Sequence, residues 1–583
     1  MSADEAVDVR LVPAALAVWA AAALALSSAA EVLVGVAAVV GALAAAVLAV
    51  PLRTEAPPRG ARPVLARRAS RAGSPSPGGA RRPPGGSVPP TGVVRRGAPR
   101  PPDRAALRGQ GGLALGAVAV LLLATGMQVR AREAGDIRGL AEERARVRLV
   151  GTVRSTPQAP GAAGGSSGVV RFLLAVDSMV AVGAGRGTEQ AIGENAGRDA
   201  GHDAGPAVAT RAAVEVYAPA AASDLAYGTR VAVEGQLSRV PDPARRAMAR
   251  ARVVDDPEVR APPCAVLRVA DGLRAGLVAT AAAVPGDAGR LLPAVAVGDT
   301  RGVGDLDDAM RVSGLAHITA VSGAHFSILG AVVLAVVTRC GVPRRWRWLP
   351  LVVALGGFVA VVQPGSSVVR AAVMGAVGVL GIVAGRPARS VPALACAVIV
   401  LLVVDPWLAR DVGFVLSVVA TAGIALLAGP LARRWSATAG ASRTRATRRT
   451  GADALPAAHP VATAFAVPVA AQAVCGPVLL VLTPAVPAYA VLANAVAAPA
   501  VAPATVGGLL AAVLGPWWPA GATWCAQGAG AACWWIAAVA RTATGLPGAQ
   551  VAWADGALGQ VLLACACGAA LVLVLRCRRA VGR

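Results

Sequence analysis

The sequence has 583 residues, of which 56% are apolar and only 15% are charged. Soluble domains contain roughly 45–50% apolar and about 25% charged residues, so a single soluble core is excluded. All 56 basic residues are arginines and stand against 32 acidic residues, which gives a formal net charge of +24. Because lysine is absent, neither a P-loop nucleotide motor nor Schiff-base chemistry is available to the chain.

Two apolar stretches open the chain and predict a transmembrane hairpin over residues 1–52. Residues 53–112 are rich in Pro, Gly and Arg, with 13 arginines against two acidic residues, so we expect a disordered basic cytoplasmic linker. The linker either marks the cytoplasmic side or tethers anionic lipid or nucleic acid. A third transmembrane helix is predicted over 113–130.

Residues 131–260 contain short segments in which apolar residues alternate with polar ones. This alternation predicts the strands of a small β-barrel or sandwich, at 147–153, 169–176, 212–217 and 229–237. A Gly/Ala/Asp-rich insertion at 183–210, which carries His202, is expected to be a loop. Residues 261–297 then predict amphipathic or interfacial helices.

The remaining chain, residues 298–576, is predicted to be a domain of membrane-spanning helices followed by a basic tail at 577–583. Its apolar stretches of bilayer length lie near 314–338, 348–363, 366–385, 391–404, 412–431, 461–483, 486–515, 520–540 and 556–575. Prolines 487, 499, 503 and 516 predict broken or re-entrant helices in 486–515. The fold class is therefore a polytopic α-helical membrane protein, with about 11–12 spans and a small extracytoplasmic β domain.

Arginine placement predicts the orientation of the chain in the membrane. Short arginine-rich connections are retained on the cytoplasmic side, and these lie at 53–112, 344–347, 386–389, 433–449 and 576–583. The N-terminus should then be cytoplasmic, and the β domain should lie outside the cell membrane. The connections 483–487 and 541–555 should share the outer side with the β domain.

Cysteines and histidines show no spacing typical of a metal site. The nine cysteines form no CxxC pair, and the four histidines form neither H-x-H nor H-E-x-x-H. His317 and His325 are eight residues apart on one predicted helix, about 80° around its axis, which places them poorly as paired metal ligands. We expect no metal, no cofactor and no catalytic centre.

Several polar side chains interrupt the apolar segments or stand at their edges. Such groups are costly at membrane depth and commonly line a water-filled path, although isolated interhelical hydrogen bonds are an alternative. The candidate pore-lining residues are Asp299, Arg311, His317, Ser322, His325, Arg370, Asp411, Ser417, Gln472 and Asn494.

Residues 314–327, GLAHITAVSGAHFS, resemble the signature of ComEC-type competence proteins. The resemblance covers about residues 290–515 and includes the blocks at 298–299, 369–374 and 405–417, together with Gln472/Pro477 and Asn494/Pro499. It implies a channel that passes single-stranded DNA into the cytoplasm during natural transformation. It also implies an OB-like barrel at 131–260, with a separate cytoplasmic translocase and an extracytoplasmic DNA receptor as partners.

Members of this family commonly carry a metallo-β-lactamase-like domain with an H-x-H-x-D-H motif, which this sequence lacks. We therefore expect no nuclease activity in this polypeptide and a separate nuclease as a further partner. Two other functions stay open. One is a membrane-embedded enzyme or small-solute transporter that uses Asp299, His317, His325 and Arg370; the other is a domain-reduced homologue without a role in transformation.

Overall fold

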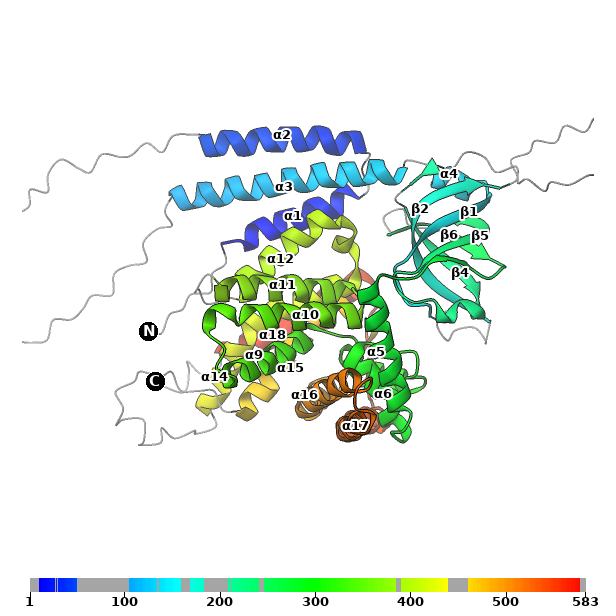
Figure 1. Ribbon diagram of the computed structural model, residues 1–583. Coiled ribbons are helices and arrows are strands. Elements are labelled where there is room, and N and C mark those ends of the chain that lie inside the picture. Colours follow the sequence, from blue (N-terminus) through cyan, green and yellow to red (C-terminus); the bar gives the residue numbers. More distant parts are fainter. Residues whose placement is uncertain are drawn as a thin grey trace, which may run out of the picture.

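A computed structural model describes residues 10–26, 28, 30–49, 104–133, 136–158, 168–182, 208–210, 212–240, 246–383, 390–438 and 460–576. A β domain lies at one end of a bundle of long helices (Figure 1). Most of the predicted linker, the insertion that carries His202, His459 and the basic tail lie outside the described residues.

Three N-terminal helices run side by side along one edge of the bundle (Figure 1). They are α1 (Val12–Ala25), α2 (Ala30–Ala49) and α3 (Arg104–Glu133). The helix predicted at 113–130 begins nine residues earlier, because the good helix formers of 104–108 continue directly into the apolar segment. Trp19 of α1 donates from Nε1 to the carbonyl of Ala409 at 3.0 Å, which holds these helices on the bundle.

In its described residues, the β domain has seven strands, one short helix α4 (Ile137–Glu142) and a 3₁₀ turn η1 (Ala220–Asp224). The strands are β1 (Arg146–Val153), β2 (Val169–Ala181), β3 (Val208–Ala209), β4 (Ala213–Pro219), β5 (Arg230–Arg239), β6 (Ala247–Val253) and β7 (Glu258–Ala261). The four segments predicted to be extended lie in β1, β2, β4 and β5. Along β1 every second residue is buried, which is the period that the sequence predicted.

The five longer strands pair in a cyclic order. β1 pairs with both β2 and β5, β2 pairs with β4, and β6 lies between β4 and β5. All these pairs are antiparallel except β4 with β6, which is parallel. Leu149, Phe172 and Leu237 are fully or almost fully buried inside, and Ile137 of α4 joins them from one end of the sheet.

Four short helices connect the β domain to the bundle: α5 (Ala265–Ala281), α6 (Gly286–Val297), α7 (Leu306–Val312) and α8 (Ala316–Thr319). On α5, Leu277 is buried while Val266 and Val269 are exposed. On α6, which packs between α5, α16 and α17, residues 291–297 are all buried, while Asp287 and Arg290 nearer its start stay partly exposed. The assignment of 261–297 to interfacial helices stays a prediction.

The bundle contains α9 (Gly323–Arg339), α10 (Trp348–Val362), α11 (Ser366–Val383), α12 (Ser390–Val404), α13 (Val412–Gly423), α14 (Gly429–Thr438), α15 (Pro460–Leu479) and α18 (Gly556–Arg576). A π-helical turn, η4 (Ile424–Ala428), joins α13 to α14. In the described part of the chain, six helices are long and apolar enough to cross a membrane, and five shorter apolar helices accompany them. This arrangement fits a polytopic helical membrane protein.

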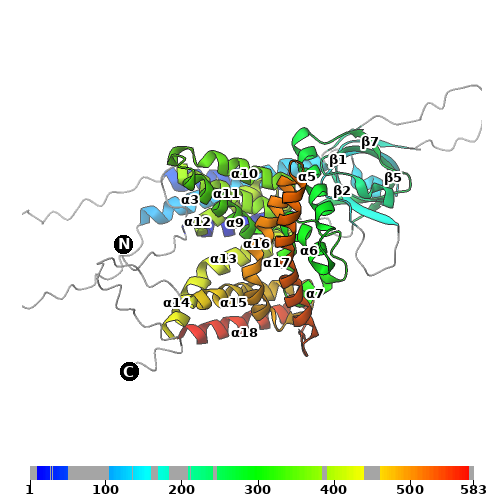
Figure 2. The ribbon, with the colours of Figure 1, turned by 60° about the horizontal axis from the view of Figure 1, so that its bottom comes forward.

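Two further helices, α16 (Ala490–Leu514) and α17 (Pro519–Gly545), run crosswise to the bundle in both views (Figures 1 and 2). α17, predicted as a span, is not among the six long apolar helices. The prediction of a broken helix at 486–515 is wrong for residues 490–514, because α16 continues through Pro499 and Pro503. Its buried alanine face packs on α6 and α17, and this packing offsets the roughly 3 kcal/mol that an internal proline costs.

A short β ladder ties together the two ends of this crosswise pair. β8 (Ala485–Pro487) pairs antiparallel with β9 (Gln550–Ala552). The end of α15 and the start of α18 therefore lie at the same end of the bundle.

Candidate functional site

The signature segment 314–327 forms two helices rather than the single predicted spanning helix. Gly314 has a φ of +75°, and Ala320 has extended backbone angles, so α8 ends before α9 begins. His317 therefore lies in α8 and His325 in α9, and the expectation that they share one helix is wrong. The break has a local cause, because Ser322 is the N-cap of α9 and begins a new helix there.

His325 folds back on this N-cap. Its Nδ1 accepts a hydrogen bond from the backbone N–H of Ser322 at 3.1 Å and lies 3.3 Å from Oγ of Ser322. The side chain is almost completely buried, with 1% of its surface exposed. Its other ring nitrogen, Nε2, makes no hydrogen bond of good geometry among the described residues, but the backbone of Val295 on α6 interacts with the ring.

Arg370 of α11 is also buried, with 3% of its surface exposed. Nε donates to Oγ of Ser417 at 2.9 Å, and Nη1 donates to Oγ1 of Thr421 at 3.1 Å and to the sulfur of Met374 at 3.2 Å. Ser417 and Thr421 are one turn apart on α13, so they share a face. No acidic side chain of the described segments lies within 4 Å of this guanidinium group.

The guanidinium also lies beside the start of α9. A Cβ built on Gly323 would lie 3.6 Å from Nη2 of Arg370. Ser367 of α11 donates to the carbonyl of Val321 at 2.6 Å, which fixes α11 against the α8–α9 break. We call Gly323, Arg370, Met374, Ser417 and Thr421 the Arg370 cluster.

Asp299, expected to line a path, is instead bound by two arginines. Its carboxylate accepts from Arg301 at 2.6 and 2.9 Å and lies 3.7 Å from Arg274. Burial alone would raise the pKa of Asp299, but the hydrogen bonds and charges of Arg301, together with the charge of Arg274, hold it below its ordinary value. Asp299 is thus a buried ion-pair partner.

Two other predicted residues have local partners. Asp411 caps α13, since its carboxylate accepts from the backbone N–H of Phe414 at 2.6 Å. Arg311 is half exposed on α7 and pairs with Asp307 and Asp308 of the same helix. The structure does not bring either residue into the Arg370 cluster.

The remaining candidates lie apart from the cluster or beside the signature segment. Asn494 of α16 donates to the carbonyl of Gly314 at 3.3 Å, so it holds the start of the signature segment. His317 is exposed on α8, and Gln472 is half-buried on α15. The structure therefore unites Ser322, His325, Arg370 and Ser417 and leaves the other six outside.

The enzyme alternative required a histidine and a carboxylate within hydrogen-bond reach. The partners of Asp299 are arginines, and His325 is engaged by the N-cap of its own helix. No group of three His, Cys, Asp or Glu side chains suited to a metal ion occurs among the described residues. The hydrolytic arrangement of Asp299, His317 and His325 is not formed.

Sequence reasoning missed two residues that organise this region. Arg274 of α5 is buried and donates to the carbonyls of Val297 and Val361 at 2.8 and 2.9 Å. Thr421 completes the hydroxyl pair that faces Arg370. Thr421 was identifiable, because it stands four residues after Ser417 on an otherwise apolar helix. The carbonyl partners of Arg274 carry no signal in the sequence.

The β domain touches the bundle at two connections. Thr156 donates to the side chain of Gln363 at 3.4 Å, just beyond the end of α10. Arg246 pairs with Asp405 at 3.0 Å, and Arg132 of α3 lies 3.4 Å from the ring centre of Trp407. The contacts of Thr156 and Arg246 hold the β domain against the ends of α10 and α12.

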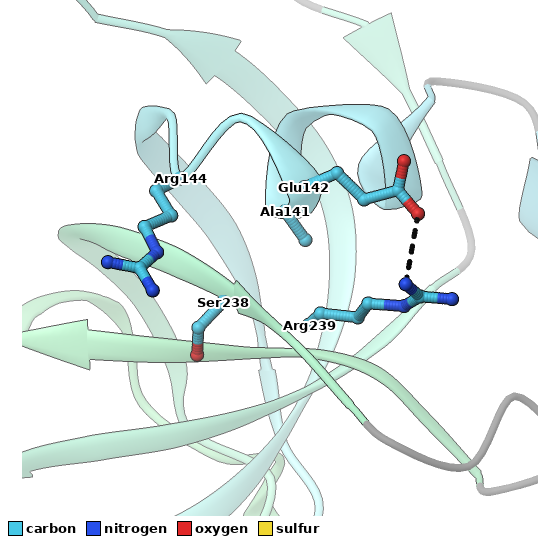
Figure 3. Close-up of a pocket in the computed structure, with 5 residues that line it drawn as sticks. All are labelled: Ala141, Glu142, Arg144, Ser238 and Arg239. Carbon is cyan, nitrogen blue, oxygen red and sulfur yellow. Dashed lines mark ion pairs between the residues drawn. The ribbon is translucent and has the colours of Figure 1, made fainter.

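A shallow depression of about 500 Å³ lies on the β domain between α4 and β5 (Figure 3). Its lining includes Arg144 and Arg239, and Arg239 pairs with Glu142 at 3.8 Å across it (Figure 3). None of the predicted site residues lines this depression.

Comparison with known proteins identifies the family. The model of the family described as "Competence protein" matches residues 296–579. ComE operon protein 3 of Bacillus subtilis (strain 168) is 33% identical over 135 residues, which is 23% of this chain and 17% of that protein. No solved structure matches the chain. The signature segment, the family match and this relative agree, so residues 296–579 form a domain of the competence-protein family.

Proposed function

We propose that this protein is a membrane channel through which single-stranded DNA enters the cytoplasm during natural transformation. Membership of the competence family supports a role in DNA uptake. The single observation that carries the channel is the β domain seated directly on the end of the family-matched bundle. A nucleic-acid-binding domain in that position would hold a strand at the entrance of the helix bundle through which the strand passes.

We propose further that the β domain is an OB-like barrel. A cyclic order of five strands with a single parallel pair supports this, since OB-folds are five-stranded Greek-key barrels that bind oligonucleotides. Phe172 lies in the core, so base stacking falls to the half-buried Tyr217 and Tyr227. Binding should depend mainly on arginine contacts to phosphate and should weaken steeply with salt.

The path through the bundle is proposed to pass the Arg370 cluster and the adjoining Ser322 and His325. Asp299, Arg311 and Asp411 are withdrawn from the proposed path because each has its own structural partner. His317 stays a candidate, since it is exposed beside the signature break. Asn494 and Gln472 stay candidates at lower rank, because they lie outside the cluster.

The chain has no lysine for a P-loop, so the pulling force is proposed to come from a separate cytoplasmic translocase. An extracytoplasmic DNA receptor and a separate nuclease complete the proposed partners. The β domain is proposed to face outward, with the N-terminus and the arginine-rich connections in the cytoplasm.

The test is deletion of the gene, followed by an uptake assay that separates surface-bound DNA from DNA protected inside the cell. We expect surface binding to persist and entry to be lost, with entry restored by the wild-type chain. His317→Ala should restore less entry than the wild type while inserting normally in the membrane. Normal entry in the deletion strain would contradict the proposed function.

A further inference from the structure

A buried guanidinium group with no anionic partner is costly. Arg370 stays charged at all physiological pH values, and moving an ion out of water costs several kcal/mol unless a charge of opposite sign is near. Its hydrogen-bond acceptors are the hydroxyls of Ser417 and Thr421 and the thioether of Met374, all of them neutral. They solvate the guanidinium but do not balance its charge.

The nearest element adds positive potential. Gly323 is the first residue of α9, a helix of 17 residues, and the amide N–H groups of Gly323 and Ala324 have no partner within the helix, whereas that of His325 is capped by Ser322. This end carries the equivalent of roughly half a positive charge. Because Gly323 has no side chain, Nη2 of Arg370 lies close to the first turn. Two positive features therefore adjoin, with no acidic side chain of the described residues between them.

His325 adds a buried donor in the same turn of α9. Its Nδ1 accepts a hydrogen bond from the N–H of Ser322, so the proton of the neutral ring is on Nε2. That Nε2–H is buried, and the backbone of Val295 on α6 interacts with the ring. The two donors that adjoin at Gly323 are therefore the guanidinium group of Arg370 and the N-terminus of α9.

We propose that the Arg370 cluster and the first turn of α9 form an anion site that holds one phosphate group of a nucleic-acid strand at a time. This inference rests on the proposed function and names the group of the substrate that the site binds. A planar guanidinium fork matches phosphate oxygens in a bidentate fashion, and backbone amides read no base sequence. The site therefore accepts any sequence, as an uptake system requires.

The neutral acceptors around Arg370 fit such a transient site. A carboxylate partner would compete with each arriving phosphate, whereas hydroxyls hold the guanidinium in place without neutralising it. Conduction requires binding strong enough for entry and weak enough for release. Since Arg370 is 3% exposed, the structure shows the site closed, and a strand reaches it only after the helices around it rearrange.

The test uses the full chain in nanodiscs of zwitterionic lipid, with two probes: inorganic phosphate and a fluorescent thymidine oligonucleotide. Arg370→Gln should weaken oligonucleotide binding about ten- to hundredfold, as expected for losing charge-assisted hydrogen bonds. The slope of log affinity against log salt should fall by about one. Arg370→Lys keeps the charge but loses the planar fork, so its oligonucleotide affinity should lie between those of the wild type and Arg370→Gln. Arg311→Gln, a paired arginine on the surface, is the matched control and should bind as the wild type does.

A strand of the same sequence with uncharged methylphosphonate linkages should bind the wild type and Arg370→Gln equally. Unchanged binding of both phosphate probes by Arg370→Gln would overturn the anion site. If Arg370→Gln does not fold, the oligonucleotide affinity of Arg370→Lys is the test. An affinity equal to that of the wild type in Arg370→Lys would overturn the bidentate site. Competition between added anionic lipid and inorganic phosphate at Arg370 would assign the site to lipid headgroups and overturn the nucleic-acid proposal.

The outcomes also separate this site from the proposed function. If phosphate binding depends on Arg370 but deletion of the gene leaves DNA entry intact, the channel function is contradicted and the anion site is supported. If deletion of the gene abolishes DNA entry but Arg370→Gln binds phosphate and takes up DNA as the wild type does, the channel function is supported and the anion site is contradicted.

Discussion

Arg274 shows how one buried side chain joins segments distant in the chain. Its guanidinium group contacts the carbonyls at the ends of α6 and α10, and it lies 3.7 Å from Asp299. Carbonyls at a helix C-terminus lack partners within their helix, and a cation there also complements the helix dipole. Arg274 is therefore a structural cation that positions the signature region, whereas Arg370 has no acidic partner in the part of the chain that the structure describes.

We predict that Arg274→Ala destabilises the protein by about 3–5 kcal/mol, because it leaves Asp299 and several helix-end carbonyls buried without this partner. Thermal unfolding in detergent, followed by tryptophan fluorescence, measures the effect. Arg311→Ala is the control, since Arg311 is about half exposed and its ion pairs lie within its own helix. Equal stability of the wild type and Arg274→Ala would show that the buried pair contributes nothing.

At the scale of elements, glycines allow helices to approach closely where a side chain would not fit. A Cβ on Gly423 of α13 would come within 2.5 Å of Cγ2 of Val474 on α15. Cys475 of α15 lies against the carbonyl of Leu416 on the same interface, with a sulfur to oxygen distance of 3.8 Å. The two helices therefore pack with almost no space between them.

Gly423→Ala should destabilise the α13–α15 interface by about 1–3 kcal/mol, because overpacking forces the backbones apart. Val474→Ala should restore much of that loss in the double variant, which a double-mutant cycle of unfolding free energies will show. Gly357→Ala on α10 has open space around its Cβ and serves as the control. Additive effects of Gly423→Ala and Val474→Ala would contradict the contact.

The crosswise helix α17 carries exposed tryptophans at 524, 534 and 535, and Trp517 and Trp518 are exposed just before it. Tryptophan concentrates at the interface between membrane and water. Arg541 pairs with Asp287 at 2.9 Å and with Asp305 at 2.8 Å, which fastens the far end of α17 to α6 and α7. We therefore expect α17 to lie along the membrane surface rather than across it.

We predict that spin labels at positions 524 and 535 report the same shallow membrane depth. These positions are eleven residues apart on nearly the same face of α17, so a spanning helix would separate them by about 16 Å in depth. Power-saturation measurements with oxygen and a water-soluble relaxation agent give the depth of each label. A pair of labels on α18, at positions 558 and 569, is the control and should differ in depth.

At the scale of the whole molecule, orientation follows from the arginine-rich connections and from the position of the β domain. The β8–β9 ladder places the connections at 485–487 and 550–552 at one end of the bundle, as the arginine pattern predicts. The chain enters α16 and leaves α17 at that same end of the bundle. The number of membrane crossings between α15 and α18 is therefore even, whether or not α16 and α17 cross the membrane.

Single cysteines in a cysteine-free background test this orientation. We expect Val254→Cys, at a site 76% exposed on the β domain, to react with an impermeant maleimide on intact cells. Arg345→Cys, in the connection between α9 and α10, should react only after the membrane is permeabilised. The opposite labelling pattern would reverse the orientation and remove the β domain from the path of incoming DNA.

The amino-acid sequence by itself determined the class of fold, the positions of four strands and the signature segment. Hydropathy, alternation and a contiguous motif are local properties, so neighbouring residues suffice to reveal them. The ten candidate pore-lining residues were also identified from their neighbours in the sequence, as polar groups in apolar segments. In the structure, four of them lie at or beside the Arg370 cluster and six lie elsewhere.

Only the tertiary structure decided the roles of the charged side chains and the directions of the helices. The hydroxyl partners of Arg370 are 47 and 51 residues away, and those of Arg274 lie on two other helices, so no local pattern separates an arginine with an acidic partner from one without. The same reason applies to α16 and α17. Their apolar length allows them to span, but packing on α6 and the β8–β9 ladder determine that they run crosswise.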